Sequence, residues 1–231
     1  MKLIRNEFTK IGIKKQIISF IILTIILTLN YFINNKNLTV DNLLTIIPFI
    51  GVILTILFSG IMSNEIENGT FRFYLTKPVN RYKIYLSKLL TIIIFVVKML
   101  MYTILFYFLI NKNINNVDNF LITSVSLILI STITIFLSTI IKNQSITSSI
   151  PILFLTFGLT ITELLLRKNI KIIEYTFIPY LDLTIFKTGM IDLLNEEYNI
   201  ALSLNKGIII IIIYSIIFTY LGAKIFKNKN I

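Results

Sequence analysis

Few side chains in this 231-residue sequence could take part in catalysis or bind a metal. There is no cysteine and no histidine, which excludes disulfides, thiol nucleophiles, cysteine or histidine metal ligands and the commonest proton shuttle. Two charged residues stand out because they lie in long apolar stretches, Lys98 and Glu163. If those stretches cross a membrane, each charge costs at least about 2.5–3.5 kcal/mol unless it faces water or a partner.

Lys98 is open to two interpretations. Its side chain can snorkel or bond to nearby hydroxyl and amide groups, or it can line a substrate route together with Glu163. A direct ion pair between the two is disfavoured, because Lys98 lies near the middle of its span and Glu163 in the outer third. Hydroxyl side chains are frequent between Thr123 and Thr162, and we expect most of them to join neighbouring helices. No dense ring of carboxylates accompanies them, which favours an amphipathic or lipid-like cargo over an ion.

The elements that carry these residues follow from composition. Hydrophobic residues make up 55% of the chain and charged residues 14%, against about 25% charged in a typical soluble domain. A soluble fold of this size could not bury so much apolar surface, and disorder requires low hydrophobicity. The composition predicts an all-α polytopic membrane protein with a single transmembrane domain over residues 1–231.

Six apolar segments are long enough to span a bilayer, which needs about 20 residues each. They are Ile17–Ile33, Leu43–Met62, Leu89–Ile110, Phe120–Ile141, Ser148–Leu166 and Gly207–Ala223. The first is predicted to be a retained helix rather than a cleaved signal peptide, because it starts late and no small-residue cleavage site follows it.

The basic residues predict the orientation. The net charge is +11. With both termini in the cytoplasm, 14 lysines and arginines fall on the cytoplasmic side and 7 on the outside, as the positive-inside rule expects. The excess of lysine also suits a surface that faces anionic lipid, so membrane lipid is an expected partner and nucleic acid is not.

Residues 1–16 are predicted to form an amphipathic helix on the cytoplasmic membrane surface. At helical spacing one arc is apolar and consists of Leu3, Ile4, Phe8 and Ile11. Glu7 falls inside this apolar arc, which leaves two interpretations: an ion pair with a nearby lysine, or contact with a partner protein.

Residues 63–88 join spans two and three on the predicted cytoplasmic side. Gly69 should end a helix that leaves span two, Thr70 can cap a new turn, and Pro78 can open the next helix. The expected result is a short helix between two bends, parallel to the membrane. Its exposed face is aromatic and apolar, with Phe71, Phe73, Tyr74 and Leu75, and such a patch requires a partner or lipid.

The extracellular segment 167–206 is long for a loop without secondary structure of its own. Apolar residues recur at helical spacing between Leu181 and Leu194, and Pro179 can open a helix. We expect short helices at the outer leaflet; a simple surface loop is the alternative.

The string Glu65-x₃-Gly69-Thr70-x₄-Leu75-x₂-Pro78-x₂-Arg81-x₆-Lys88 resembles the signature of the ABC-2 type permeases. These are membrane subunits of a large class of ABC transporters, most of them exporters. The layout agrees over essentially the whole length: an N-terminal amphipathic helix with an acidic residue, six spans, and a long outer segment between the last two. Lys98 departs from the pattern, because an apolar or small residue is expected there.

The resemblance implies a mechanism in which the short cytoplasmic helix sits in a cleft of a separate ATPase subunit. Two ATPase subunits close on ATP and move two permease subunits between access states. The residues implied in this coupling are Glu65, Gly69, Thr70, Phe71, Arg72 and Tyr74. Pro78 and Arg81 would set the bend back into the membrane, and Glu7 would brace the contact.

The sequence has no phosphate-binding G-x-x-x-x-G-K-[ST] string. We therefore expect no cofactor or metal on this chain, ATP and Mg²⁺ on two copies of a partner ATPase, and a second permease subunit, identical or homologous. The expected protein is not an enzyme but the permease of a bacterial cytoplasmic-membrane exporter, with a bacteriocin or cytolytic peptide as the favoured cargo. Lipid, glycan, drug or ion cargo, and an ATP-independent channel or scaffold, are the alternatives.

Overall fold

A computed structural model describes residues 2–34, 39–68, 80–112, 117–187 and 189–229 of the chain. These residues are almost entirely helical and contain no strand. Six of the described helices are long and apolar enough to cross a bilayer. The predicted all-α membrane fold with six spanning helices is therefore confirmed.

The six spans correspond one for one to the predicted segments. Span one is α2 (Ile13–Ile33), span three α7 (Arg81–Asn111), span five α10 (Gln144–Arg167) and span six α12 (Leu204–Asn228). Span two (Asn42–Glu67) comprises α3 (Val40–Leu44), α4 (Ile46–Phe58) and α5 (Gly60–Glu67). Span four (Asp118–Ile140) comprises α8 (Val117–Thr123) and α9 (Ser126–Ile140).

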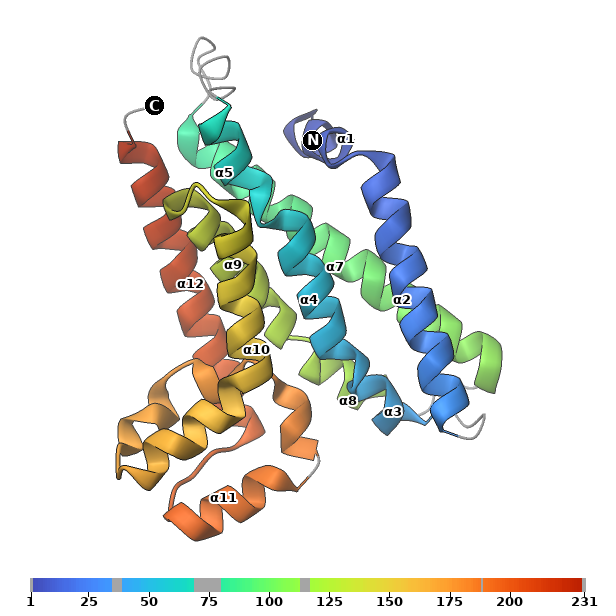
Figure 1. Cartoon of the computed structure of the whole chain (residues 1–231), viewed down its shortest axis with the longest axis vertical. Coiled ribbons are helices and arrows are strands. Elements are labelled where there is room, and N and C mark those ends of the chain that lie inside the picture. The colour runs from blue at the N-terminus through green and yellow to red at the C-terminus, as the bar shows by residue number, and fades with distance from the viewer. Residues whose placement is uncertain (1, 35–38, 69–79, 113–116, 188, 230–231) are drawn as a thin grey trace.

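The helices run between two ends of the molecule that differ in character (Figure 1). Both chain termini, α1 (Lys2–Ile11), the end of α5 and the beginning of α7 lie at one end, which we call the terminus-bearing end. The opposite end carries α3, α8 and the segment that leads from α10 to α12. The N-terminal helix and the two helix ends that flank residues 69–79 therefore lie at the same end of the molecule. All three belong to the sequence resemblance.

Helix α9 lies at the centre of the bundle and is the most enclosed of the spans, whereas α2 is the least enclosed. Helix α12 packs more extensively on α9 than on any other element. An aromatic chain joins the outer helices to the core: the Phe20 ring centroid lies 5.8 Å from that of Phe95, which lies 5.4 Å from that of Phe58. The exposed apolar face of α2 is suited to contact with lipid.

Span two is interrupted at Ser59, between α4 and α5. The first amide groups of any helix lack partners within that helix. Here Ser138 of α9 supplies one, because its Oγ accepts hydrogen bonds from the backbone amides of Met62 at 2.9 Å and Ser63 at 3.1 Å. The sequence analysis expected most of these hydroxyls to join helices; Ser138 does so, whereas Ser131 and Thr134 bond to carbonyls of their own helix.

The segment between α10 and α12 contains short helices, in agreement with the sequence analysis. They are η1 (Lys171–Tyr175), η2 (Ile178–Tyr180), η3 (Leu183–Lys187) and α11 (Met190–Tyr198). Pro179 lies in the first turn of η2, where a missing amide proton costs nothing. A partly buried ion pair, Lys206 to Glu174 at 2.8 Å, joins η1 to the start of α12. Burial raises the pKa of the nearby Asp182 carboxyl, although hydrogen bonds from Thr184 oppose the shift.

Candidate functional site

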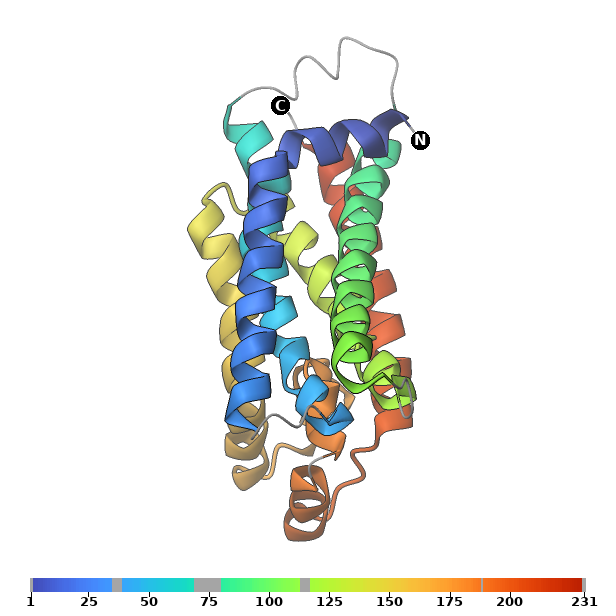
Figure 2. The same cartoon turned by 90° about the vertical axis from the view of Figure 1, so that its right-hand side faces the viewer.

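Helix α1 lies across the terminus-bearing end, transverse to α2, and reaches the start of α7 (Figure 2). The corner is made at Gly12, whose φ of 77° and ψ of 136° suit a residue without a Cβ. Gln16 fixes this corner, since its Nε2 donates to the Phe8 carbonyl at 3.1 Å. The amphipathic helix predicted over residues 1–16 is therefore shorter than expected and ends at Ile11.

Four charged residues meet where α1, α5 and α7 converge, and we call them the charge cluster: Glu7, Lys10, Glu65 and Lys88. The Lys88 Nζ lies 2.7 Å from the Glu7 Oε2 and 2.9 Å from the Glu65 Oε2. The Lys10 Nζ lies 3.0 Å from the Glu7 Oε1 and 2.7 Å from the Glu65 Oε1. Each lysine therefore bridges both carboxylates, and the four charges cancel.

The charge cluster is largely removed from solvent. The side chain of Lys88 is 0% exposed and that of Glu7 4% exposed, while Glu65 is 15% and Lys10 37% exposed. Lys88 also donates to the Ile61 carbonyl at 3.1 Å. A buried charge is costly unless it is paired and hydrogen-bonded, so this arrangement requires α1, α5 and α7 to keep one relative position.

The charge cluster lies beside both flanks of residues 69–79. Glu65 is in the last turn of α5, just before this segment, and Lys88 is in the second turn of α7, just after it. Six of the predicted coupling residues lie outside the described residues, and the predicted short cytoplasmic helix with them: Gly69, Thr70, Phe71, Arg72, Tyr74 and Pro78. Of the predicted coupling residues, the structure brings Glu7 and Glu65 together through the two lysines.

Arg81 is the first residue of α7, directly after the N-cap Asn80. Its guanidinium donates to the carbonyls of Lys227 at 3.0 Å and Lys229 at 2.7 Å, at the end of α12. Cations stabilise the carboxyl end of a helix, where carbonyl groups lack partners. Arg81 therefore joins the beginning of α7 to the end of α12, a contact that the sequence analysis did not foresee. Burial and the nearby Lys142 ammonium lower the pKa of Lys229.

Lys98 and Glu163 are not brought together. Lys98 lies on an exposed face of α7, and its Nζ is 4.5 Å from the centroid of the Phe8 ring in α1. Glu163 pairs with Arg167 one turn further along α10. The structure therefore gives the Lys98 side chain a cation–π contact on the outside of α7, which favours the snorkelling interpretation over a place in a substrate route.

The local ion pair that the sequence analysis offered for Glu7 is present, with Lys10 as its lysine, but the sequence analysis missed Lys88 as a member of the charge cluster. Lys88 was taken as a loop charge before span three, which was predicted to begin at Leu89; the helix in fact begins at Arg81. Lys88 can be buried because it pairs with Glu7, which lies 81 residues earlier in the chain, and with Glu65, which lies 23 residues earlier. Glu7 is the residue from which Lys88 could have been inferred. An acidic residue on an apolar arc indicates a cation on another helix, in addition to its local pair with Lys10.

Comparison with known proteins gives a family for this fold. A family model described as "Protein of unknown function (DUF2705)" matches residues 16–231. The chain belongs to the DUF2705 family. The matched residues of this DUF2705 protein include Glu65, Arg81 and Lys88, while α1 with Glu7 and Lys10 precedes them.

A curated relative is the "Uncharacterized protein YhcI" of Bacillus subtilis (strain 168). It is 24% identical to this DUF2705 protein over 208 residues, which cover 78% of the chain. The match spans 64% of the relative's own length.

Proposed function

We propose that this protein is the transmembrane permease subunit of an ATP-driven, ABC-2 type exporter. Residues 69–79 would dock on a separate ATPase subunit, and the six spans would contribute half of the transport pathway, with a second permease subunit supplying the rest. ATP and Mg²⁺ would be bound by the ATPase partner.

The observation that carries this proposal is the charge cluster. It joins α1, α5 and α7 at the two flanks of residues 69–79, through four N–O contacts of 2.7–3.0 Å. A docking segment can move the spanning helices as one unit only if the helix ends on its two sides are held firmly to each other. The Lys88–Glu7 pair is buried and supports that rigidity, because separating it would leave uncompensated charge in a low-dielectric environment.

The force would pass from the docked segment to α5 and α7 together. The contact between Arg81 and the end of α12 extends the connection to span six, and Ser138 extends it from α5 to the central helix α9. A displacement of residues 69–79 would therefore act on four spans rather than on one. Helix α1, lying across this end, would brace the same assembly.

The proposed membrane is the bacterial cytoplasmic membrane, with both termini in the cytoplasm. The excess of lysine and arginine on the terminus-bearing side supports this orientation. The proposed cargo is an amphipathic molecule, a peptide such as a bacteriocin or cytolytic peptide in the first place, whose export would also protect the producing cell. A lipid, a glycan, a drug or an ion is the alternative cargo, and the transport mechanism would be the same.

An ATP-independent channel or scaffold is the competing proposal. The two are distinguished by co-expressing the chain with a Walker-A ATPase encoded beside it and reconstituting the purified complex into liposomes. A permease retains the ATPase through purification, and cargo raises the rate of ATP hydrolysis. A channel or scaffold purifies without an ATPase and conducts or binds its ligand in the absence of ATP.

A further inference from the structure

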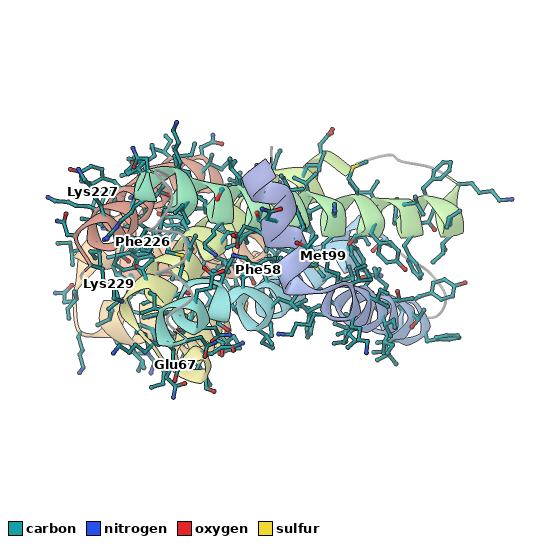
Figure 3. The ribbon with its side chains drawn as sticks, turned by 90° about the horizontal axis from the view of Figure 1, so that it is seen from above. Phe58, Glu67, Met99, Phe226, Lys227 and Lys229 are labelled. Carbon is teal, nitrogen blue, oxygen red and sulfur yellow. The ribbon has the colours of Figure 1, made fainter. Side chains whose placement is uncertain are left out.

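Two adjoining cavities form one groove at the terminus-bearing end. The first, of about 530 Å³, lies among α1, α4, α5 and the start of α10; the second, of about 280 Å³, continues between α2 and α4. Both are lined by Lys15, Leu57 and Gln144, so the two cavities adjoin at these side chains. In Figure 3, which views this end from above, Phe58 of the first cavity lies beside α1, while Lys227 and Lys229 lie at the far side of the molecule.

The groove changes from polar to apolar along its length. Its mouth carries polar side chains from several elements: Lys10, Lys15, Asn64, Asn68 and Gln144. The second cavity is lined mainly by apolar side chains of two spans: Ile18, Ile22, Ile53, Ile56 and Leu57. A polar mouth at the level of the helix ends and an apolar slot that opens toward the bilayer interior match the layout of a lipid, with its headgroup at the interface and its acyl chain below.

The charge at the mouth indicates the kind of headgroup. The four members of the charge cluster neutralise one another, so Glu7 and Glu65 leave no net negative charge. Lys15 is exposed and makes no ion pair or hydrogen bond with any residue that the structure describes. The Gln144 Oε1 accepts from the Asn64 Nδ2 at 3.1 Å, which leaves the Gln144 amide protons for another acceptor. A free ammonium and a free amide donor suit a phosphate oxygen.

We propose that this groove binds an anionic phospholipid of the leaflet at the terminus-bearing end. The phosphate lies against Lys15 and Gln144, and one acyl chain lies between α2 and α4 along Ile18, Ile22 and Ile56. The bound lipid fills the space between the least enclosed span, α2, and the rest of the bundle. This proposal rests on the membrane fold and not on the exporter assignment, so the two can fail separately.

The test is native mass spectrometry of the purified full-length chain with phosphatidylglycerol and, in parallel, phosphatidylcholine. Lys15→Gln should lower the bound fraction of phosphatidylglycerol, with a loss of affinity on the order of tenfold for one charge-assisted contact. The matched control is Lys14→Gln: Lys14 is an exposed neighbour that does not line either cavity, and its variant should bind phosphatidylglycerol like the unaltered chain.

A second variant tests the acyl slot without altering charge. Ile56 is 53% exposed and lines the slot, so Ile56→Trp should fill it and lower the binding of both lipids while the protein stays monodisperse. Equal binding of the two lipids by the unaltered chain, or equal loss in Lys14→Gln and Lys15→Gln, would overturn the proposal, as would unchanged binding by Ile56→Trp.

Discussion

Lys88 is the residue on which the candidate site depends most. Its side chain is fully buried and forms ion pairs with two carboxylates from different helices. Whether such a pair stabilises a fold relative to apolar side chains varies from protein to protein, but removal of one partner leaves a buried charge unpaired. Replacing one charged residue of the cluster should therefore lower the stability of the fold, whereas replacing a residue together with its partner of opposite charge should lower it less.

We predict that Lys88→Met destabilises the protein by about 3–5 kcal/mol, because Glu7 and Glu65 then lose a buried cation that both contact. Thermal unfolding in detergent measures the effect. Adding Glu7→Gln to this variant removes the excess negative charge and should recover much of the loss. The control Lys83→Met alters an exposed lysine of the same helix and should stay within about 0.5 kcal/mol; equal effects of Lys88→Met and Lys83→Met would contradict the prediction.

For Lys98 we predict a small effect. Its contact with the Phe8 ring is at an exposed site, where a cation–π interaction contributes about 0.5–1 kcal/mol. Lys98→Leu should therefore lower the unfolding temperature slightly and leave transport unchanged in a liposome assay. A large loss of transport with normal folding would instead restore Lys98 to the substrate route.

The residue types of the candidate site could be read in part from the sequence. Glu7 was conspicuous because it interrupts an apolar arc, and Glu65 because it belongs to the signature string. Lys88 belongs to the same string, but nothing in its sequence neighbourhood reveals that folding brings it a carboxylate from α1. Ion pairs between residues that are distant in the chain cannot be predicted from the pattern of neighbouring residues.

At the scale of elements, the position of α1 depends on a single backbone conformation. Gly12 has φ 77° and ψ 136°, a combination open to almost no other residue. Among the described residues other than Gly12 and its two chain neighbours, no atom lies within 4 Å of the place where a Cβ would stand, so the backbone conformation and not crowding makes glycine necessary.

We predict that Gly12→Ala destabilises the docking of α1 by about 1–3 kcal/mol. Limited proteolysis of the N-terminal residues, together with thermal unfolding, reports the change. Asn6→Ala, at an exposed position of the same helix, is the matched control and should behave like the unaltered chain. Equal protease sensitivity of the two variants would show that α1 does not need the bend at Gly12.

The spanning helices were predictable because each is a long apolar run, and most of their ends fall within a few residues of the predicted ones. The exceptions have physical reasons. Span three begins earlier because Lys88 is neutralised inside the fold, and the break at Ser59 between α4 and α5 follows from a hydroxyl of α9 rather than from the local sequence.

At the scale of the whole molecule, the two ends have different tasks in the proposed function. The terminus-bearing end holds the charge cluster and both flanks of residues 69–79, and the opposite end holds the short helices between α10 and α12. The proposal requires the first to face the cytoplasm and the second the outside.

The absence of cysteine makes that orientation simple to test. Single cysteines at Glu67 and at Glu196 occupy exposed positions at the two ends. In intact cells an impermeant thiol reagent should label Glu196→Cys and leave Glu67→Cys unlabelled until the membrane is permeabilised. The reverse pattern would show that the termini face outward, and a docking site for a cytoplasmic ATPase would then be impossible.

The central claim, that residues 69–79 are where an ATPase docks, is tested most directly by co-purification of the chain with its candidate ATPase. A fully buried aromatic side chain contributes about 1.5–3 kcal/mol, so Phe71→Ala and Tyr74→Ala should each lower the retained ATPase about tenfold or more. Phe32→Ala, which alters an aromatic residue that is 64% exposed on α2, is the matched control and should retain the ATPase in full. Undiminished retention and ATP hydrolysis in both the Phe71→Ala and the Tyr74→Ala complexes would contradict the account.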